Sequence, residues 1–199
     1  MSSLCRFFVG LFALIGAFFV ILFLCTLIIN RTIQFPTFQV ESASLNQLTG
    51  NGRKLGTEKM SAAWNITVSL SNPKQYLSVS YQDTLDAEIF YMDEYGGIIT
   101  LNTSTIQPFN GSMIEMKLKV DSCEPHVTNN IYRSRREHGR VEFGLKLFTS
   151  IQFKKDIFES NWITLKVVCY PLSFVISQNV YNITTSAGIL LQGVTCTRS

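Results

Sequence analysis

The chain has 199 residues, with 17 basic and 14 acidic side chains and a formal net charge of +3. Charge this balanced argues against nucleic acid or an acidic substrate as the partner. Beyond an apolar N-terminal run, residues 36–199 are enough for one domain with its own core, and no repeat or low-complexity tract interrupts them.

Residues 7–29 form an apolar run without a charged side chain. As a helix rising about 1.5 Å per residue, it would reach about 34 Å and cross a hydrocarbon core. A cleaved signal peptide is the alternative, but its apolar core normally covers about 7 to 15 residues before a small-x-small cleavage site, a pattern that this run lacks. The sequence therefore predicts a cytosolic tail at 1–6, a single uncleaved transmembrane signal anchor at 7–29, a linker at 30–35 and a domain at 36–199.

Five Asn-x-Ser/Thr sequons indicate on which side of the membrane this domain lies. Asn30 directly follows the apolar run, too close to the membrane for modification, whereas the other four lie in the domain. N-Glycosylation places a sequon in the secretory lumen, so we expect an exoplasmic domain. The candidate glycosylation sites are Asn65, Asn102, Asn110 and Asn182.

Three of the five cysteines lie in the domain, an odd number for an oxidising compartment. Cys169 and Cys196 each end an apolar segment, so we expect a disulfide between them. Closing this loop would stabilise the fold by about 3 to 4 kcal/mol in the chain-entropy model. Cys123 then stays a buried thiol or an intermolecular partner. No Cys-x-x-Cys pair or His cluster has the spacing of a zinc site.

From Phe35 onward, apolar and polar residues alternate with the period of a β-strand. The clearest strand is 64–70, with Asn65 on its polar face and Asn72-Pro73 as its end, since proline cannot donate to a ladder. Further strands are expected at 38–41, 77–81, 87–91, 98–101, 114–120, 141–147 and 163–169, and a last apolar run at 189–191 leads to Val194 and Cys196. Pro171 is expected to end the strand 163–169, and both tryptophans, Trp64 and Trp162, are expected in the core. Seven or more short strands separated by turns predict an all-β fold, a β-sandwich.

The polar stretch 121–138 interrupts the alternation and predicts one short helix, with Thr128 as its N-cap and Gly139 as its terminator. A basic cluster occupies this region, with Glu137 interleaved. We interpret the cluster as a solvated helix face, against the alternative of a site for anionic polysaccharide or lipid headgroups. Its members are Arg133, Arg135, Arg136 and Arg140.

Several features follow one another through most of the chain. They are the apolar anchor, Pro36-Thr37-Phe38-Gln39-Val40, Ser71-Asn72-Pro73-Lys74 with Tyr81 and Asp83 downstream, Pro108-Phe109, and 141–169 with its Lys-Val-x-Cys ending. In this order they resemble the plant harpin-induced and non-race-specific-disease-resistance-like proteins, which carry a late-embryogenesis-abundant group 2 domain. The family pattern Asn-Pro-Asn and Tyr-Asp is altered here, because Lys74 replaces the second Asn and Gln82 separates Tyr81 from Asp83.

The resemblance implies an immunoglobulin- or fibronectin-III-like β-sandwich with one helix. It also implies a single-pass tether to the plasma membrane, or alternatively to the endoplasmic reticulum membrane, with the C-terminal domain exoplasmic. Members of this family are associated with defence and stress responses, which indicates a process rather than a mechanism.

No arrangement of residues predicts an enzyme or a cofactor. His126 and His138 stand apart, and neither a Gly-x-Ser-x-Gly nor a His-Glu-x-x-His motif occurs. Asp93-Glu94 precedes a glycine turn, where paired acids are usually solvated.

Two functions remain. The first is a membrane-anchored interaction module with protein partners at the membrane or cell wall. The alternative is a lipid-binding or lipid-transfer domain whose apolar strands open a groove near the bilayer.

Overall fold

The computed structural model of the chain forms two compact units, Met1–Phe35 and Pro36–Ser199. The residues it describes are 10–12, 14–24, 35–51, 59–72, 78–92, 96–106, 112–121, 123–155, 158–176 and 186–199.

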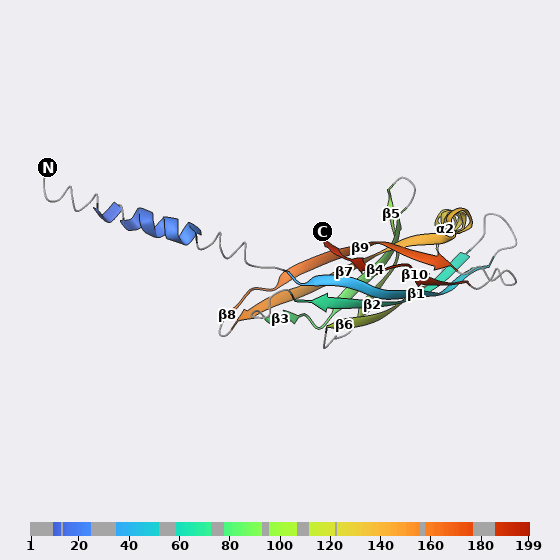
Figure 1. The fold of residues 1–199 in the computed structure, drawn as a ribbon, viewed down its shortest axis with the longest axis horizontal. Coiled ribbons are helices and arrows are strands. Elements are labelled where there is room, and N and C mark those ends of the chain that lie inside the picture. The colour runs from blue at the N-terminus through green and yellow to red at the C-terminus, as the bar shows by residue number, and fades with distance from the viewer. Residues whose placement is uncertain are drawn as a thin grey trace. The chain divides into compact units, whose positions relative to one another are not determined.

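In the first unit, residues 10–12 and 14–24 are helical (Figure 1). Among the described residues, no helix is both long enough and apolar enough to cross a membrane. The anchor predicted at 7–29 includes residues 7–9, 13 and 25–29, which lie outside the described residues, so it stays a prediction.

The second unit is mostly β-strand, which confirms the all-β class, and it contains one α-helix among its described residues. The elements are β1 (Thr37–Asn51), β2 (Lys59–Ser71), β3 (Ser78–Tyr81), β4 (Leu85–Met92), β5 (Ile98–Ile106), β6 (Met113–Val120), α2 (Pro125–His138), β7 (Arg140–Lys155), β8 (Phe158–Glu159), β9 (Ile163–Ile176), β10 (Ser186–Leu190), β11 (Val194–Thr195) and β12 (Thr197–Arg198).

The strands are hydrogen-bonded along one antiparallel path, in the order β5-β4-β7-β9-β10-β1-β2-β6. The short strands β3 and β8 pair with β7, while β11 pairs with β1 and β12 with β9. The two ends of the path approach each other, because the side-chain amide of Asn102 on β5 donates to the carbonyl of Lys119 on β6. The sheet is therefore nearly closed on itself. Register shifts in β1, β4 and β7 mark β-bulges, which bend strands and allow such curvature.

Apolar residues fill the space inside this sheet. On β6 the side chains alternate regularly, so that Ile114, Met116, Leu118 and Val120 are buried and the residues between them are exposed. The ring of Trp64 is fully buried, as predicted, and packs edge-on against Phe143 at 5.2 Å between ring centroids. Phe143 in turn meets Phe174 edge-on at 5.8 Å.

The prediction that Trp162 lies in the core is wrong, because its side chain is 52% exposed. Trp162 precedes the first residue of β9, Ile163, and therefore stands outside the ladder that turns alternate side chains inward.

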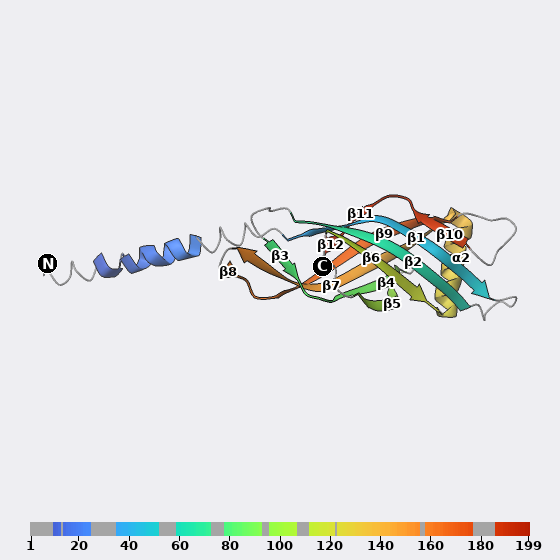
Figure 2. The same ribbon diagram turned by 90° about the horizontal axis from the view of Figure 1, so that it is seen from below.

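Helix α2 lies at one end of the strands and contacts β7 and β2 through a buried face (Figures 1 and 2). The predicted N-cap is wrong. Glu124 occupies that position, Pro125 opens the helix, and Thr128 is buried in the first turn with its hydroxyl donating to the Glu124 carbonyl at 3.1 Å. Proline suits the first position of a helix because a backbone N–H there would have no acceptor within the helix, so its absence costs no hydrogen bond. The predicted terminator is confirmed, since Gly139 adopts φ 67° and its N–H donates to the Arg135 carbonyl at 2.9 Å.

Residues 186–199 fill a slot between β9 and β1 (Figure 2). β10 pairs with both β1 and β9. Further along the segment, β11 pairs only with β1 and β12 pairs only with β9. The predicted disulfide between Cys169 and Cys196 is present, with 4.2 Å between the two Cα atoms. It ties the C-terminal segment to the middle of β9.

Candidate interaction surface

The outer face of β9 and β10 carries exposed apolar side chains, which we call the β9–β10 surface. Val175 and Ile189 are cross-strand partners, 47% and 73% exposed, and Leu191 beyond them is 61% exposed. Solvent-exposed apolar side chains that adjoin one another commonly mark interaction sites.

A change of alternation in β9 places Val175 on this face. From Leu165 to Cys169 the odd-numbered residues are buried, whereas Tyr170 and Pro171 are both exposed and from Leu172 onward the even-numbered residues are buried. The paired stretch of β7 shows a register shift opposite this point. The prediction that Pro171 ends this strand is therefore wrong, because β9 continues through the shift to Ile176.

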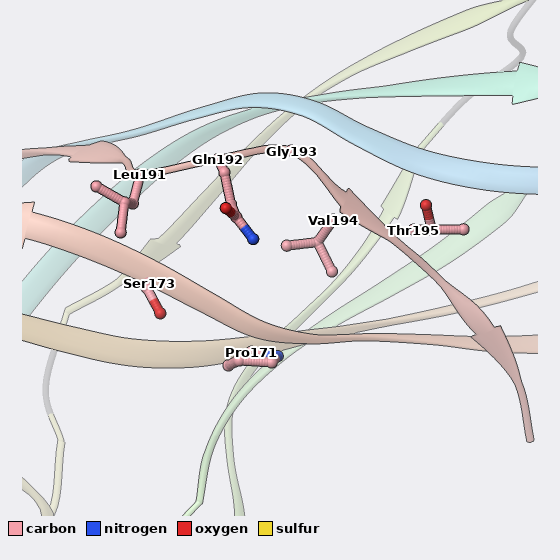
Figure 3. A pocket seen from close by; sticks show the side chains of 7 residues that line it. All are labelled: Pro171, Ser173, Leu191, Gln192, Gly193, Val194 and Thr195. Atoms are coloured by element: carbon pink, nitrogen blue, oxygen red, sulfur yellow. The ribbon is translucent and has the colours of Figure 1, made fainter.

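A shallow pocket of about 310 Å³ adjoins the exposed apolar side chains. It is lined by Pro171, Ser173, Leu191, Gln192, Gly193, Val194 and Thr195 (Figure 3). The pocket forms where the C-terminal segment leaves β9: the Leu191 N–H donates to the Ser173 carbonyl at 2.9 Å, and pairing with β9 resumes only at Thr197.

Gly193 fixes the path of the segment past this pocket. A Cβ atom at Gly193 would lie 2.9 Å from the carbonyl oxygen of Val40 on β1. Only glycine allows the segment to pass so close to β1, and the side chain of Gln192 then points toward β9 (Figure 3).

The lining of the pocket offers polar and apolar contacts. Its polar groups are hydroxyl, amide and backbone groups, and none of the lining side chains is ionisable. The Ser173 hydroxyl donates to the Glu142 carboxylate at 3.2 Å, so it is engaged in a structural contact. Such a lining provides hydrogen bonds and apolar contacts but no general acid or base.

An ion pair on the outer face of β4 and β7 lies near the ring of Phe90, which stacks on Tyr170. Glu88 and Lys146 form an ion pair at 2.9 Å, with only 16% and 14% of their side chains exposed. Burial alone would raise the pKa of Glu88, but hydrogen bonds from Thr100 and Lys146 together with the lysine charge outweigh it and hold the pKa below its usual value. One carboxylate oxygen of Glu88, Oε1, thus accepts hydrogen bonds from both Thr100 and Lys146, which fits a structural role.

Aromatic rings cover this ion pair. The Lys146 ammonium lies 4.9 Å from the centroid of the Phe90 ring. The ring of Phe90 stacks against that of Tyr170, with 6.0 Å between the two ring centroids. Burial, with a smaller contribution from the charge of Glu142, raises the pKa of Tyr170. Tyr170 is therefore a neutral, positioned ring next to the pocket residue Pro171.

The predicted basic cluster divides between two places. Arg135 and Arg136 lie in the last turn of α2, whereas Arg140 begins β7, pairs across the sheet with Val175 and lies 3.8 Å from Glu142. One arginine of the cluster thus borders the β9–β10 surface.

The sequons fall in different environments. Asn65 is exposed on the polar face of β2, as predicted, while Asn102 on β5 is half-buried. Asn110 and Asn182 lie outside the described residues.

The residues of the family pattern lie at two strand ends. Asn72 is exposed after β2, and Pro73 lies outside the described residues. Tyr81 ends β3, where burial raises its pKa to about 12, and Asp83 is exposed in the following bend.

Cys123 lies just before α2, and His126 lies in its first turn. Cys123 is half-buried and forms no disulfide, and burial raises the pKa of its thiol to about 11, so the unreactive thiol form predominates at neutral pH. His126 lies 3.3 Å from Glu124 on the exposed side of α2. Within the described ranges, no three His, Cys, Asp or Glu side chains gather around a point where a metal ion could bind.

No model of a known protein family matches this sequence, and no curated protein matches it either. These comparisons leave the resemblance to the late-embryogenesis-abundant group 2 proteins untested.

Sequence reasoning did not single out Val175, Ile189 and Leu191 as surface residues. A signal was present in Ile189-Leu190-Leu191, because a strand turns alternate side chains to opposite faces and an apolar run must expose some of them unless both faces are covered.

Proposed function

We propose that this protein is a membrane-anchored, non-enzymatic interaction module whose domain, residues 36–199, lies on the exoplasmic side of the plasma membrane. One observation carries the proposal. Eleven large apolar side chains of the helical residues 11, 12 and 14–24 are 43% to 71% exposed. Leaving apolar surface in water is unfavourable by about 25 cal/mol per Å², and a bilayer would remove this surface from water.

The disulfide and the sequons support the exoplasmic side. Disulfides persist in oxidising compartments, and a disulfide joins Cys169 on β9 to Cys196 in the C-terminal segment. The exposed sequon at Asn65 is compatible with a glycan added in the secretory lumen.

The β9–β10 surface supports an interaction role. Val175, Ile189 and Leu191 offer apolar contact area, and the adjoining pocket offers hydrogen bonds. The resemblance to plant proteins of defence and stress responses supplies the process and the immunoglobulin-like sandwich as further parts of the proposal.

The alternative, a lipid carrier, requires an apolar cavity between the strands. In the described part of the domain, Trp64, Phe143 and Phe174 pack together in that space, and the pocket lies on the outer face. No observation there favours a lipid carrier over the interaction module.

Alkaline extraction and protease protection in sealed microsomes test the proposal with the full chain. We expect the wild-type protein to stay with the membrane and its domain to resist added protease. The double variant Phe18→Arg/Ile21→Arg should be extracted, because each arginine at the centre of a span disfavours insertion by about 3 to 4 kcal/mol relative to the apolar residue.

The matched control adds the same two charges to exposed positions of the domain, Asn129→Arg and Asn161→Arg, and should behave as the wild type. Extraction of the wild-type protein, or digestion of its domain in sealed vesicles, would refute the proposal.

A further inference from the structure

We propose that Asn65 carries an N-linked glycan in the mature protein and that the sequon at Asn102 is unmodified. The inference rests on the proposed exoplasmic position of the domain. It is drawn from the different surroundings of the two asparagine amides in the folded sheet.

Asn65 lies at the middle of β2, between Ser44 on β1 and Lys117 on β6. Its side chain is exposed, and within the described part of the chain its amide has no hydrogen-bond partner. The outward-facing neighbours along β1 and β2 are small and polar, namely Ser42, Ser44, Thr67 and Ser69. A sugar attached to this side-chain nitrogen would therefore point into solvent, and the side chains beneath it on β1 and β2 are small.

Asn102 lies at the place where the sheet closes. Its Nδ2 atom, the atom that a glycan would be attached to, donates to the carbonyl oxygen of Lys119 across the boundary between β5 and β6. On its other side, Asn102 is paired with Ile89 of β4. A sugar on Nδ2 would occupy the space between β5 and β6 and push the two ends of the sheet apart.

The modification is a group transfer from a polyprenyl-diphosphate-linked oligosaccharide. The amide nitrogen of Asn65 attacks the anomeric carbon of the first sugar, the bond from that carbon to the diphosphate oxygen breaks, and the lipid diphosphate leaves with the electron pair. One amide proton passes to a base of the transferase. The hydroxyl required two residues after the acceptor is supplied by Thr67.

Because the transferase acts on chains that have not finished folding, the folded structure decides which modified chains can complete the sheet. A chain with a glycan at Asn65 can pair β1, β2 and β6 without displacing a side chain. A chain with a glycan at Asn102 cannot bring β5 and β6 to the same approach. Mature protein is thus expected to carry sugar at Asn65 and none at Asn102.

Glycopeptide mass spectrometry on the full chain, produced in a eukaryotic secretory host, tests the inference. The chain carries a reporter Asn-Ser-Thr sequon after Ser199, and two variants remove one hydroxyl each, Thr67→Ala for the Asn65 site and Ser104→Ala for the Asn102 site. We expect Thr67→Ala to lose one glycan and Ser104→Ala to lose none. Asn65→Gln removes the acceptor and retains Thr67, and it should lose the same glycan. It is the control for the case in which Thr67→Ala loses the glycan because the variant misfolds.

The reporter separates the two proposals. A modified reporter together with an unmodified Asn65, or with a glycan at Asn102 in the mature protein, would overturn this inference and leave the topology standing. An unmodified reporter together with an unmodified domain would overturn the exoplasmic position itself, and the inference with it.

Discussion

Gly144 shows how one missing side chain shapes an outer face. Phe90 points outward from β4, yet only 1% of it is exposed, because its ring lies over the backbone of Gly144 on the neighbouring strand. An added Cβ at Gly144 would clash with the ring of Phe90. The glycine thus seats the ring that covers the Glu88–Lys146 ion pair and stacks on Tyr170.

We expect Gly144→Ala to lower the free energy of unfolding by about 1 to 3 kcal/mol, as overpacking does in filled sites. Gly188→Ala is the matched control, because the nearest atoms to its added Cβ lie at 3.4 Å, an ordinary van der Waals distance. Urea unfolding of both variants measures the difference. Equal stability of the two variants would show that Phe90 moves aside without loss.

At the scale of elements, α2 illustrates which end of a helix a sequence determines. Gly139 was predictable because the left-handed conformation at a helix C-terminus favours one residue type above all others. The N-terminus was not, because Thr128 is a good capping residue by type but is buried against the sheet, and the helix extends back to Pro125. Tertiary burial outweighed the local capping preference.

Gly139→Ala should therefore destabilise the domain by about 1 kcal/mol, since a Cβ disfavours the left-handed conformation. Gly139→Asn should lose less, because asparagine tolerates that conformation better than other non-glycine residues. Thermal unfolding followed by far-UV circular dichroism compares the two. An alanine variant as stable as the asparagine variant would contradict the assigned C-cap.

At the scale of the whole domain, residues 186–199 complete the sheet. Without this segment, β9 and β1 would lose the strand that lies between them, and the path from β5 to β6 would be broken in the middle. The disulfide between Cys169 and Cys196 holds the part of the segment that follows the bend at Leu191 and Gln192.

The double variant Cys169→Ser/Cys196→Ser should be less stable by about 3 to 4 kcal/mol, because the loop between the two cysteines is no longer closed in the unfolded chain. Cys123→Ser is the control, since it removes a thiol without opening the loop. Urea unfolding of the full chain in detergent gives both values. A loss below about 1 kcal/mol would indicate that strand pairing alone keeps the segment in place.

The sequence by itself determined the strand-rich character of the domain, because alternation of period two reports directly on which side chains are buried. The regular burial on β6 and the fully buried Trp64 follow from it. The sequence also indicated the partners in the disulfide, since Cys169 and Cys196 each end an apolar segment.

Only the tertiary structure decided how the strands join. A single nearly closed path, the change of alternation at Tyr170 and Pro171, and the slot filled by the C-terminal segment all depend on pairings between residues far apart in the chain. The β9–β10 surface and the contrast between Asn65 and Asn102 follow from those pairings. A local pattern shows that a side chain lies on one face of a strand, but the neighbouring strand decides whether that face is open to solvent or closed by another backbone.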